Sequence, residues 1–193
     1  MKDMFPGVAF RDKAVPPAKA ARDVRLRARS RSTPCLVHRA PDGQTPLFSV
    51  EFVRPGHSDR WPGRPEPEDT YFRMGLDATA DEDSAFIGFS CGKGVKRNGP
   101  PVVWGFFVMT AEGKALAKPP EKAAKGRAPM AVLHSATRSM ARTLGCQEES
   151  GLPERVPEPS PHDTYREPPS VESLYDEFTR EWKADGKVPG GAP

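Results

Sequence analysis

Apolar residues in the middle of the chain form short runs, each separated from the next by glycine, proline or charged residues. In the run 47–53, three apolar residues alternate with Ser49 and Glu51, as in a strand with one buried face. Four more runs of this kind predict strands over residues 35–38, 71–76, 85–91 and 102–109. We therefore expect an antiparallel sheet of four or five strands.

Details within these runs sharpen the prediction. The turn 41–43 joins the first two runs, which indicates a hairpin. The run 102–109 is apolar on both faces, which is typical of a central strand. Gly75, Gly88 and Gly105 lie inside strand-like runs, so we expect close backbone approach at these positions.

A spacing of three and four residues predicts two helices near the C-terminal end. The longer one begins with Pro129 in its first turn and ends at Gly145. Its apolar stripe consists of Met130, Leu133, Thr137, Met140 and Leu144. The second has Ser170 as its N-cap and ends at Gly186. Its apolar face consists of Val171, Leu174, Phe178 and Trp182.

The 23 prolines divide the chain into a folded middle and extended ends, because none lies between Asp69 and Gly99. We expect an α+β domain, with one long helix on the sheet, over residues 34–145. Pro16 and Pro17 favour an extended basic arm over residues 1–33. An acidic proline-rich linker is predicted over residues 146–169. A short docking helix follows over residues 170–186, and a tail over residues 187–193.

Charge is segregated along the chain, although the formal net charge is only +3. Residues 1–40 hold ten basic against three acidic side chains, and residues 91–145 hold ten against two. Such basic stretches favour docking on RNA, DNA or an acidic protein surface, and a merely solvated face is the competing interpretation. The candidate anion-binding residues are Lys93, Lys96, Arg97, Arg138, Arg142, Arg25, Arg27 and Arg29.

The C-terminal helix is the other candidate for binding. Its apolar anchors suit a helix that inserts into a groove on a partner protein after a flexible tether. The alternative is that the helix folds back on the sheet of its own chain. The candidate partner-binding residues are Leu174, Tyr175, Phe178 and Trp182.

Motifs for catalysis, metals and nucleotides are incomplete. The loop 88–94 fails the phosphate-loop pattern, because Gly94 stands where a Ser or Thr would hold Mg²⁺. Cys91 is a candidate thiol nucleophile beside Lys93, but no histidine is near it in sequence to act as its base. We therefore expect no enzyme activity, no small-molecule substrate and no cofactor.

Metal sites are not expected either. The scattered residues Cys35, His38, His57, Cys91 and Cys146 lack the paired spacing of zinc ligands. The acidic stretch that contains Asp77, Asp81 and Asp83 lacks the central glycine and the terminal glutamate of a calcium loop.

Three widely spaced cysteines favour an intracellular reducing compartment. The Ala- and Arg-rich stretch 8–32 faintly resembles a transit segment, so a mitochondrial location is one prediction and a cytoplasmic one the other. We expect no membrane-spanning segment.

Taken with the charge pattern, the features above predict a non-catalytic accessory or structural subunit that contacts other proteins and RNA. A ribonucleoprotein such as an organellar ribosome is the assembly that the basic arms suit best. The alternatives are a free nucleic-acid-binding module and an accessory subunit of a respiratory or other membrane complex.

Overall fold

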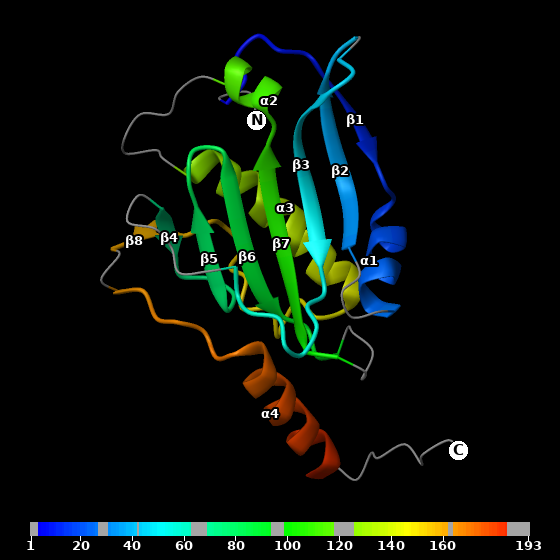
Figure 1. Ribbon diagram of the computed structural model, residues 1–193, viewed down its shortest axis with the longest axis vertical. Helices are drawn as coiled ribbons and strands as arrows, with labels where there is room; N and C mark the ends of the chain where they lie inside the picture. The colour runs from blue at the N-terminus through cyan, green and yellow to red at the C-terminus, as the bar shows by residue number, and fades with distance from the viewer. Residues whose placement is uncertain are drawn as a thin grey trace.

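The computed structural model describes residues 4–26, 31–41, 43–62, 69–93, 99–117, 126–161 and 164–184. Within these residues, eight strands form one sheet in the order β1-β2-β3-β7-β6-β5-β4-β8, and each neighbouring pair is antiparallel (Figure 1). The strands are β1 (Phe10–Ala14), β2 (Arg31–Arg39), β3 (Pro46–Val53), β4 (Thr70–Phe72), β5 (Asp77–Ala80), β6 (Ser84–Ser90), β7 (Val102–Met109) and β8 (Pro159–Ser160).

The structure confirms the α+β class and the antiparallel sheet, but the expected strand number of four or five is wrong. The predicted hairpin is present as β2 and β3, and the run 102–109 is the central strand β7. The additional strands are short or polar. β5 lies in the acidic stretch that contains Asp77, and β8 has two residues and begins with a proline.

The expectation of an extended arm over residues 1–33 is also wrong, because this segment contains β1 and the helix α1 (Pro17–Leu26). Pro17 is the first helical residue, a position where a proline costs no hydrogen bond. The side chains of Ala20, Ala21 and Val24 are buried in the core beneath it. A few small apolar residues were therefore enough to dock a helix that the prolines seemed to forbid.

The long helix α3 (Arg127–Leu144) confirms the predicted one and ends at Gly145, whose positive φ of 81° suits a glycine. It packs on β5, β6 and β7. Gly105 of β7 makes this approach close, because a Cβ there would lie 3.2 Å from the Thr137 hydroxyl and 3.3 Å from the Leu133 side chain. The short helix α2 (Ala111–Leu116) directly follows β7 and is capped by Thr110.

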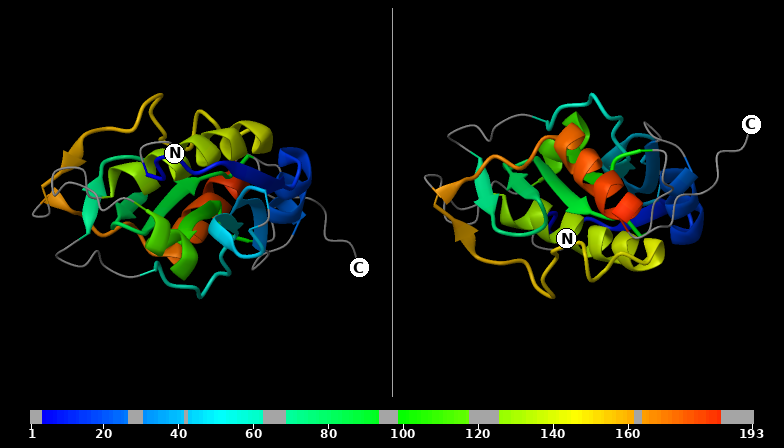
Figure 2. Two further views of the ribbon diagram at one scale, coloured as in Figure 1. Left: turned by 90° about the horizontal axis from the view of Figure 1, so that it is seen from above. Right: turned by 90° about the horizontal axis from the view of Figure 1, so that it is seen from below.

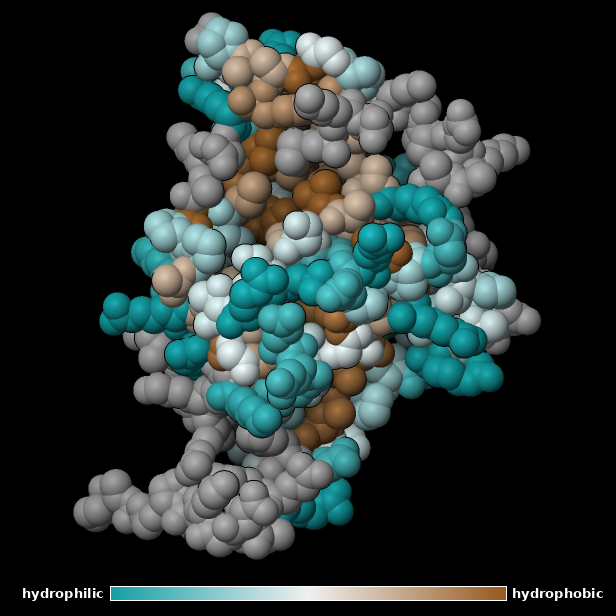
Figure 3. Space-filling view, turned by 180° about the vertical axis from the view of Figure 1, so that it is seen from behind, coloured by the Kyte–Doolittle hydropathy of each residue, from teal (hydrophilic) through white to brown (hydrophobic). Residues whose placement is uncertain are grey.

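The two faces of the sheet differ in what covers them. Along β7, Val103 and Phe107 belong to the core under α3, whereas Trp104 and Phe106 belong to a second cluster on the opposite face. Figure 2 shows α3 on one side of the sheet and α4 (Val171–Ala184) on the other. Seen from behind, the α3 side is largely polar, with apolar residues visible in a hollow nearer α2 (Figure 3).

Helix α4 confirms the predicted C-terminal helix. The Ser170 hydroxyl accepts a 3.0 Å hydrogen bond from the Ser173 N–H, as an N-cap does. In Figure 1 this helix begins at the lower end of the sheet and runs on past it. Among the helices that the structure describes, none is both long and apolar enough to cross a membrane.

Candidate functional site

Four aromatic rings gather on the sheet face opposite α3. The centroid of the Trp61 ring lies 5.7 Å from that of Trp104 and 6.1 Å from that of Phe86. Phe86 lies 5.3 Å from Phe106, its partner across β6 and β7. Edge and tilted contacts at these distances are favourable for aromatic pairs. We refer to Trp61, Phe86, Trp104 and Phe106 as the aromatic cluster.

Trp61 is the one member of this cluster that does not come from a strand. A Cβ on Gly88 would collide with the Trp61 ring, so the indole can pack here because residue 88 is a glycine. The sequence predicted close approach at Gly88, but it gave no prediction for Trp61. A large aromatic residue among prolines and glycines was the available signal.

Helix α4 meets this cluster with its first turn. Val171 is buried and Leu174 is half-buried, and both pack against the cluster that contains Phe86 and Trp104. The ring of Tyr175 meets that of His57 edge-on at 3.8 Å. Of the predicted partner-binding residues, the structure thus places Leu174 and Tyr175 against the body. The side chains of Phe178 and Trp182 lie outside the described part.

Two further contacts fix the segment that leads into α4. The Tyr165 side chain hydrogen-bonds the Asp77 carboxylate, and its ring meets that of Tyr71 edge-on at 5.2 Å. Burial raises the pKa of Asp77 to about 6, although hydrogen bonds from the Ala78 N–H and from Tyr165 oppose the rise. A cavity of about 510 Å³ remains between residues 57–61 and 165–172, so the two segments do not fill the space between them.

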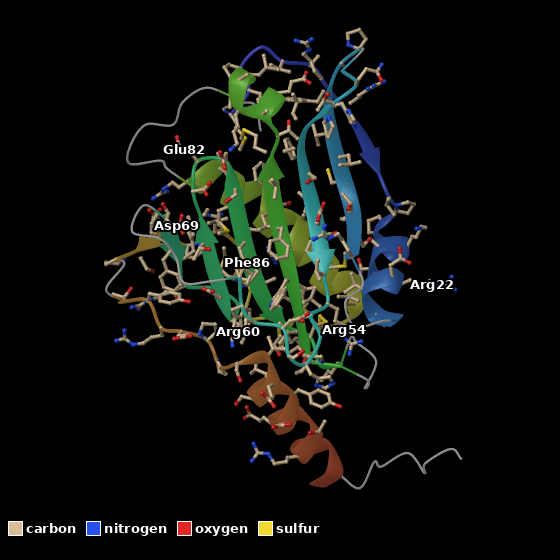
Figure 4. The ribbon with its side chains drawn as sticks, viewed as in Figure 1. Arg22, Arg54, Arg60, Asp69, Glu82 and Phe86 are labelled. Carbon is tan, nitrogen blue, oxygen red and sulfur yellow. A yellow bond between two sulfur atoms is a disulfide. The ribbon has the colours of Figure 1, made fainter. Side chains whose placement is uncertain are left out.

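Arg54 lies at the lower end of the sheet, where α4 begins (Figure 4). Its side chain is fully buried, and its guanidinium donates to the carbonyl oxygens of Pro100 and Arg25, at 3.4 and 3.2 Å. Burial lowers the pKa of this guanidinium from its ordinary value. Arg54 therefore joins three segments of backbone next to the start of α4, a role that the sequence did not indicate.

The predicted basic residues come together only in part. Lys93, Arg138 and Arg142 line one cavity of about 720 Å³, but Glu148 and Glu154 line it too, together with Glu149. Arg25 reaches the same end of α3 and donates a 3.1 Å hydrogen bond to the Leu144 carbonyl. The cavity is therefore of mixed charge. The remaining candidates, Lys96, Arg97, Arg27 and Arg29, lie outside the described residues.

The cysteine arrangement differs from the expectation. Cys91, the candidate nucleophile, forms a disulfide with Cys146, which is 55 residues away in sequence. Cys91 follows the last residue of β6, and Cys146 follows the C-cap of α3, so the ends of two packed elements bring them together. While this bond is intact, Cys91 has no thiol to act as a nucleophile. Sequence separation alone gave no indication of the pairing.

Comparisons with protein-family models, curated proteins and solved structures give no match to this chain. The functional assignment therefore depends on the chemistry and geometry of the residues described above.

Proposed function

We propose that this chain is a non-catalytic accessory subunit that binds a partner protein through α4 and the exposed part of the sheet face on which the first turn of α4 packs. The observation that carries the proposal is the placement of α4. Its first turn is anchored on the aromatic cluster, while the rest of the helix extends beyond the sheet (Figure 1). A helix that is fixed at one end and projects from the body is in position to enter a groove on another protein.

The exposed side chains of α4 indicate the chemistry of the partner. Glu172, Asp176 and Glu177 are exposed on it, with Arg180 as the exposed basic residue in the same described stretch. In the sequence, Phe178 and Trp182 continue the spacing of the apolar residues Val171 and Leu174. This combination suits a partner with an apolar groove and basic residues at its rim.

The sheet face on which the first turn of α4 packs offers a second contact, toward the end of β7 that is remote from the helix (Figure 1). Val108 of β7 is 48% exposed, and Phe106 beside it is half-buried. Polar residues border them: Ser49 and Ser84 pair with Val108 on either side, and Glu51 pairs with Phe106. An apolar centre with a polar border is the usual anatomy of a protein interface.

Site-specific photo-crosslinking tests the proposal in the full chain, expressed in its source organism. A photoreactive phenylalanine derivative is placed at Glu177 on α4, at Val108 on β7, or at Ser139, which is exposed on α3. We expect the first two positions to label the same protein and Ser139 not to label it. Equal labelling from Ser139, or no labelling from Glu177, would contradict the proposal.

A ribonucleoprotein, such as an organellar ribosome, is the second candidate for the assembly. Three basic residues, Lys93, Arg138 and Arg142, line one cavity, and this supports RNA binding. The glutamates that line the same cavity oppose it. Replacing the three basic residues with Gln should weaken RNA binding and flatten its salt dependence by about 0.9 log–log units for each phosphate that is no longer neutralised. Without measurable RNA binding by the unaltered chain at low salt, this candidate fails.

A further inference from the structure

The disulfide lies beside a carboxylate that belongs to neither strand nor helix. The sulfur atoms of Cys91 and Cys146 and a carboxylate oxygen of Glu149 all lie within 4.8 Å of one another. Both cysteines are buried and Glu149 is half-buried. Two cysteine sulfurs, once reduced to thiolates, and a carboxylate at this separation are a ligand set for a borderline-soft divalent metal ion.

Backbone hydrogen bonds hold all three residues in place. The Cys91 N–H donates to the Pro101 carbonyl at 2.7 Å, and the Cys146 N–H donates to the Ala141 carbonyl at 2.9 Å. The Glu149 carboxylate accepts a 2.9 Å hydrogen bond from the Lys93 N–H. The positions of the three groups are thus set by the surrounding backbone and do not depend on the sulfur–sulfur bond alone.

We propose that reduction of the Cys91–Cys146 disulfide converts this cluster into a zinc site with Glu149 as the third ligand. A small dithiol transfers two electrons and two protons, so that the S–S bond breaks, two thiols form and the dithiol becomes a cyclic disulfide. Zn²⁺ then displaces the two thiol protons and binds both sulfurs and the carboxylate. This inference does not depend on the proposed docking function.

The geometry allows this change with little movement. Two thiolates that bind one zinc ion at about 2.3 Å in a tetrahedron are about 3.8 Å apart. The Cα atoms of the two cysteines are 5.1 Å apart, so rotation of the side chains can open the sulfurs to that distance. Cys146 and Glu149 also line the cavity of about 720 Å³, which gives the ion a route and leaves room for water as the fourth ligand.

Electrostatics favours the occupied site. Two thiolates and one carboxylate carry three negative charges, so a bound Zn²⁺ leaves a net charge of about −1. Besides Glu149, the same cavity is lined by three basic residues, Lys93, Arg138 and Arg142, and by two acidic ones, Glu148 and Glu154. Its remaining lining thus has a net charge of +1, which offsets that of the occupied site. Positive charges near a cysteine also stabilise the thiolate over the thiol, which makes the metal easier to bind at neutral pH. Mg²⁺ and Ca²⁺ prefer an all-oxygen set and are not expected to compete.

The test measures Zn²⁺ binding to the full chain by competition with a chromogenic chelator. The protein is used either oxidised or after treatment with a dithiol that is then removed without oxygen. We expect one Zn²⁺ per reduced chain and none per oxidised chain. The Glu149→Gln variant should bind at least about tenfold more weakly, since even outer-shell changes cost that much. Glu82→Gln, at an exposed site between β5 and β6 that does not line this cavity, should match the unaltered chain.

Two further measurements, the absorption of bound Co²⁺ and the melting temperature, test the zinc site even if reduction destabilises the fold. Co²⁺ in the reduced chain should give thiolate-to-metal charge-transfer absorption, which the Cys91→Ala/Cys146→Ala double variant should lack. Zn²⁺ should raise the melting temperature of the reduced chain and leave that of the double variant unchanged. The inference is overturned if the reduced chain binds no zinc, or if Glu149→Gln binds it as tightly as Glu82→Gln does.

Discussion

The indole N–H of Trp61 donates a 2.8 Å hydrogen bond to the carbonyl oxygen of Pro169, which is 108 residues away in sequence. Pro169 stands directly before the N-cap of α4, so this bond connects the loop that follows β3 to the start of the C-terminal helix. The ring that donates it rests on Gly88 of β6. Trp61 therefore links the start of α4 to the sheet, in addition to the packing of Val171 and Leu174.

Trp61→Phe should loosen α4 without unfolding the sheet, because it removes the hydrogen-bond donor and keeps most of the apolar surface. We expect a loss of about 1 kcal/mol in the local opening free energy of the first turn of α4. Hydrogen exchange at the amides of residues 173–175 measures it. Val108→Ala, a change at an exposed site on the same sheet face, should leave that exchange unchanged, and equal effects of the two variants would contradict this role of Trp61.

Gly88→Ala should displace the Trp61 indole from its position on β6, because the added methyl group and the ring cannot occupy the same space. The expected cost is about 1–3 kcal/mol in the free energy of unfolding, as for other overpacked sites. Urea denaturation measures this cost, and near-ultraviolet circular dichroism reports the moved ring. Ser90→Ala, on the same strand and face, serves as the control and should cost much less.

Asp77 makes the stability of the protein depend on pH. Because burial raises its pKa to about 6 in the folded chain, the folded state holds this proton more tightly than the unfolded state does. Its contribution is most favourable below about pH 4 and is lost as pH rises through about 6. Asp77→Asn should therefore raise the free energy of unfolding at pH 7 relative to the unaltered chain, and the difference should shrink toward pH 4.

Urea denaturation across this pH range checks the sign. Asn also retains an oxygen that can accept the hydrogen bond from Tyr165, so the absence of that bond should not obscure the effect. A variant that is less stable than the unaltered chain by the same amount at every pH would show that Asp77 acts through packing alone.

The disulfide should contribute strongly to stability, since it closes a long loop between β6 and the end of α3. For a sequence separation of 55 residues, the chain-entropy relation gives about 4 kcal/mol. Cys91→Ala/Cys146→Ala should lower the urea midpoint accordingly. Adding a dithiol should then have little effect on the double variant while it destabilises the unaltered chain. A reductant effect of the same size on both would contradict this assignment.

The parts of the fold that the sequence predicted are those with strong local patterns. The helix α3 has an apolar stripe, a starting proline and a terminal glycine, and β7 is a continuous apolar run. By contrast, β1 is charged and β8 has only two residues, so each gains its structure from pairing with a neighbouring strand. Local patterns contain no information about such pairing.

The same limit applies to the site. The apolar spacing made Leu174 a candidate, and the charge pattern made Lys93, Arg138 and Arg142 candidates, because those signals are local. The aromatic cluster, the Cys91–Cys146 disulfide and the Trp61–Pro169 hydrogen bond join segments that are far apart in sequence. They follow from the order of the strands in the sheet, which the sequence did not predict.

The most direct test of the docking function is the native size of the full chain when it is purified from its source. Phe178 and Trp182, which continue the apolar spacing of α4 in the sequence, are replaced together by Ala. We predict that the unaltered chain elutes in a stoichiometric complex, whereas the variant elutes as a free chain with an unchanged melting temperature. If the variant remains in the complex, or if it loses thermal stability instead, α4 is not the docking element.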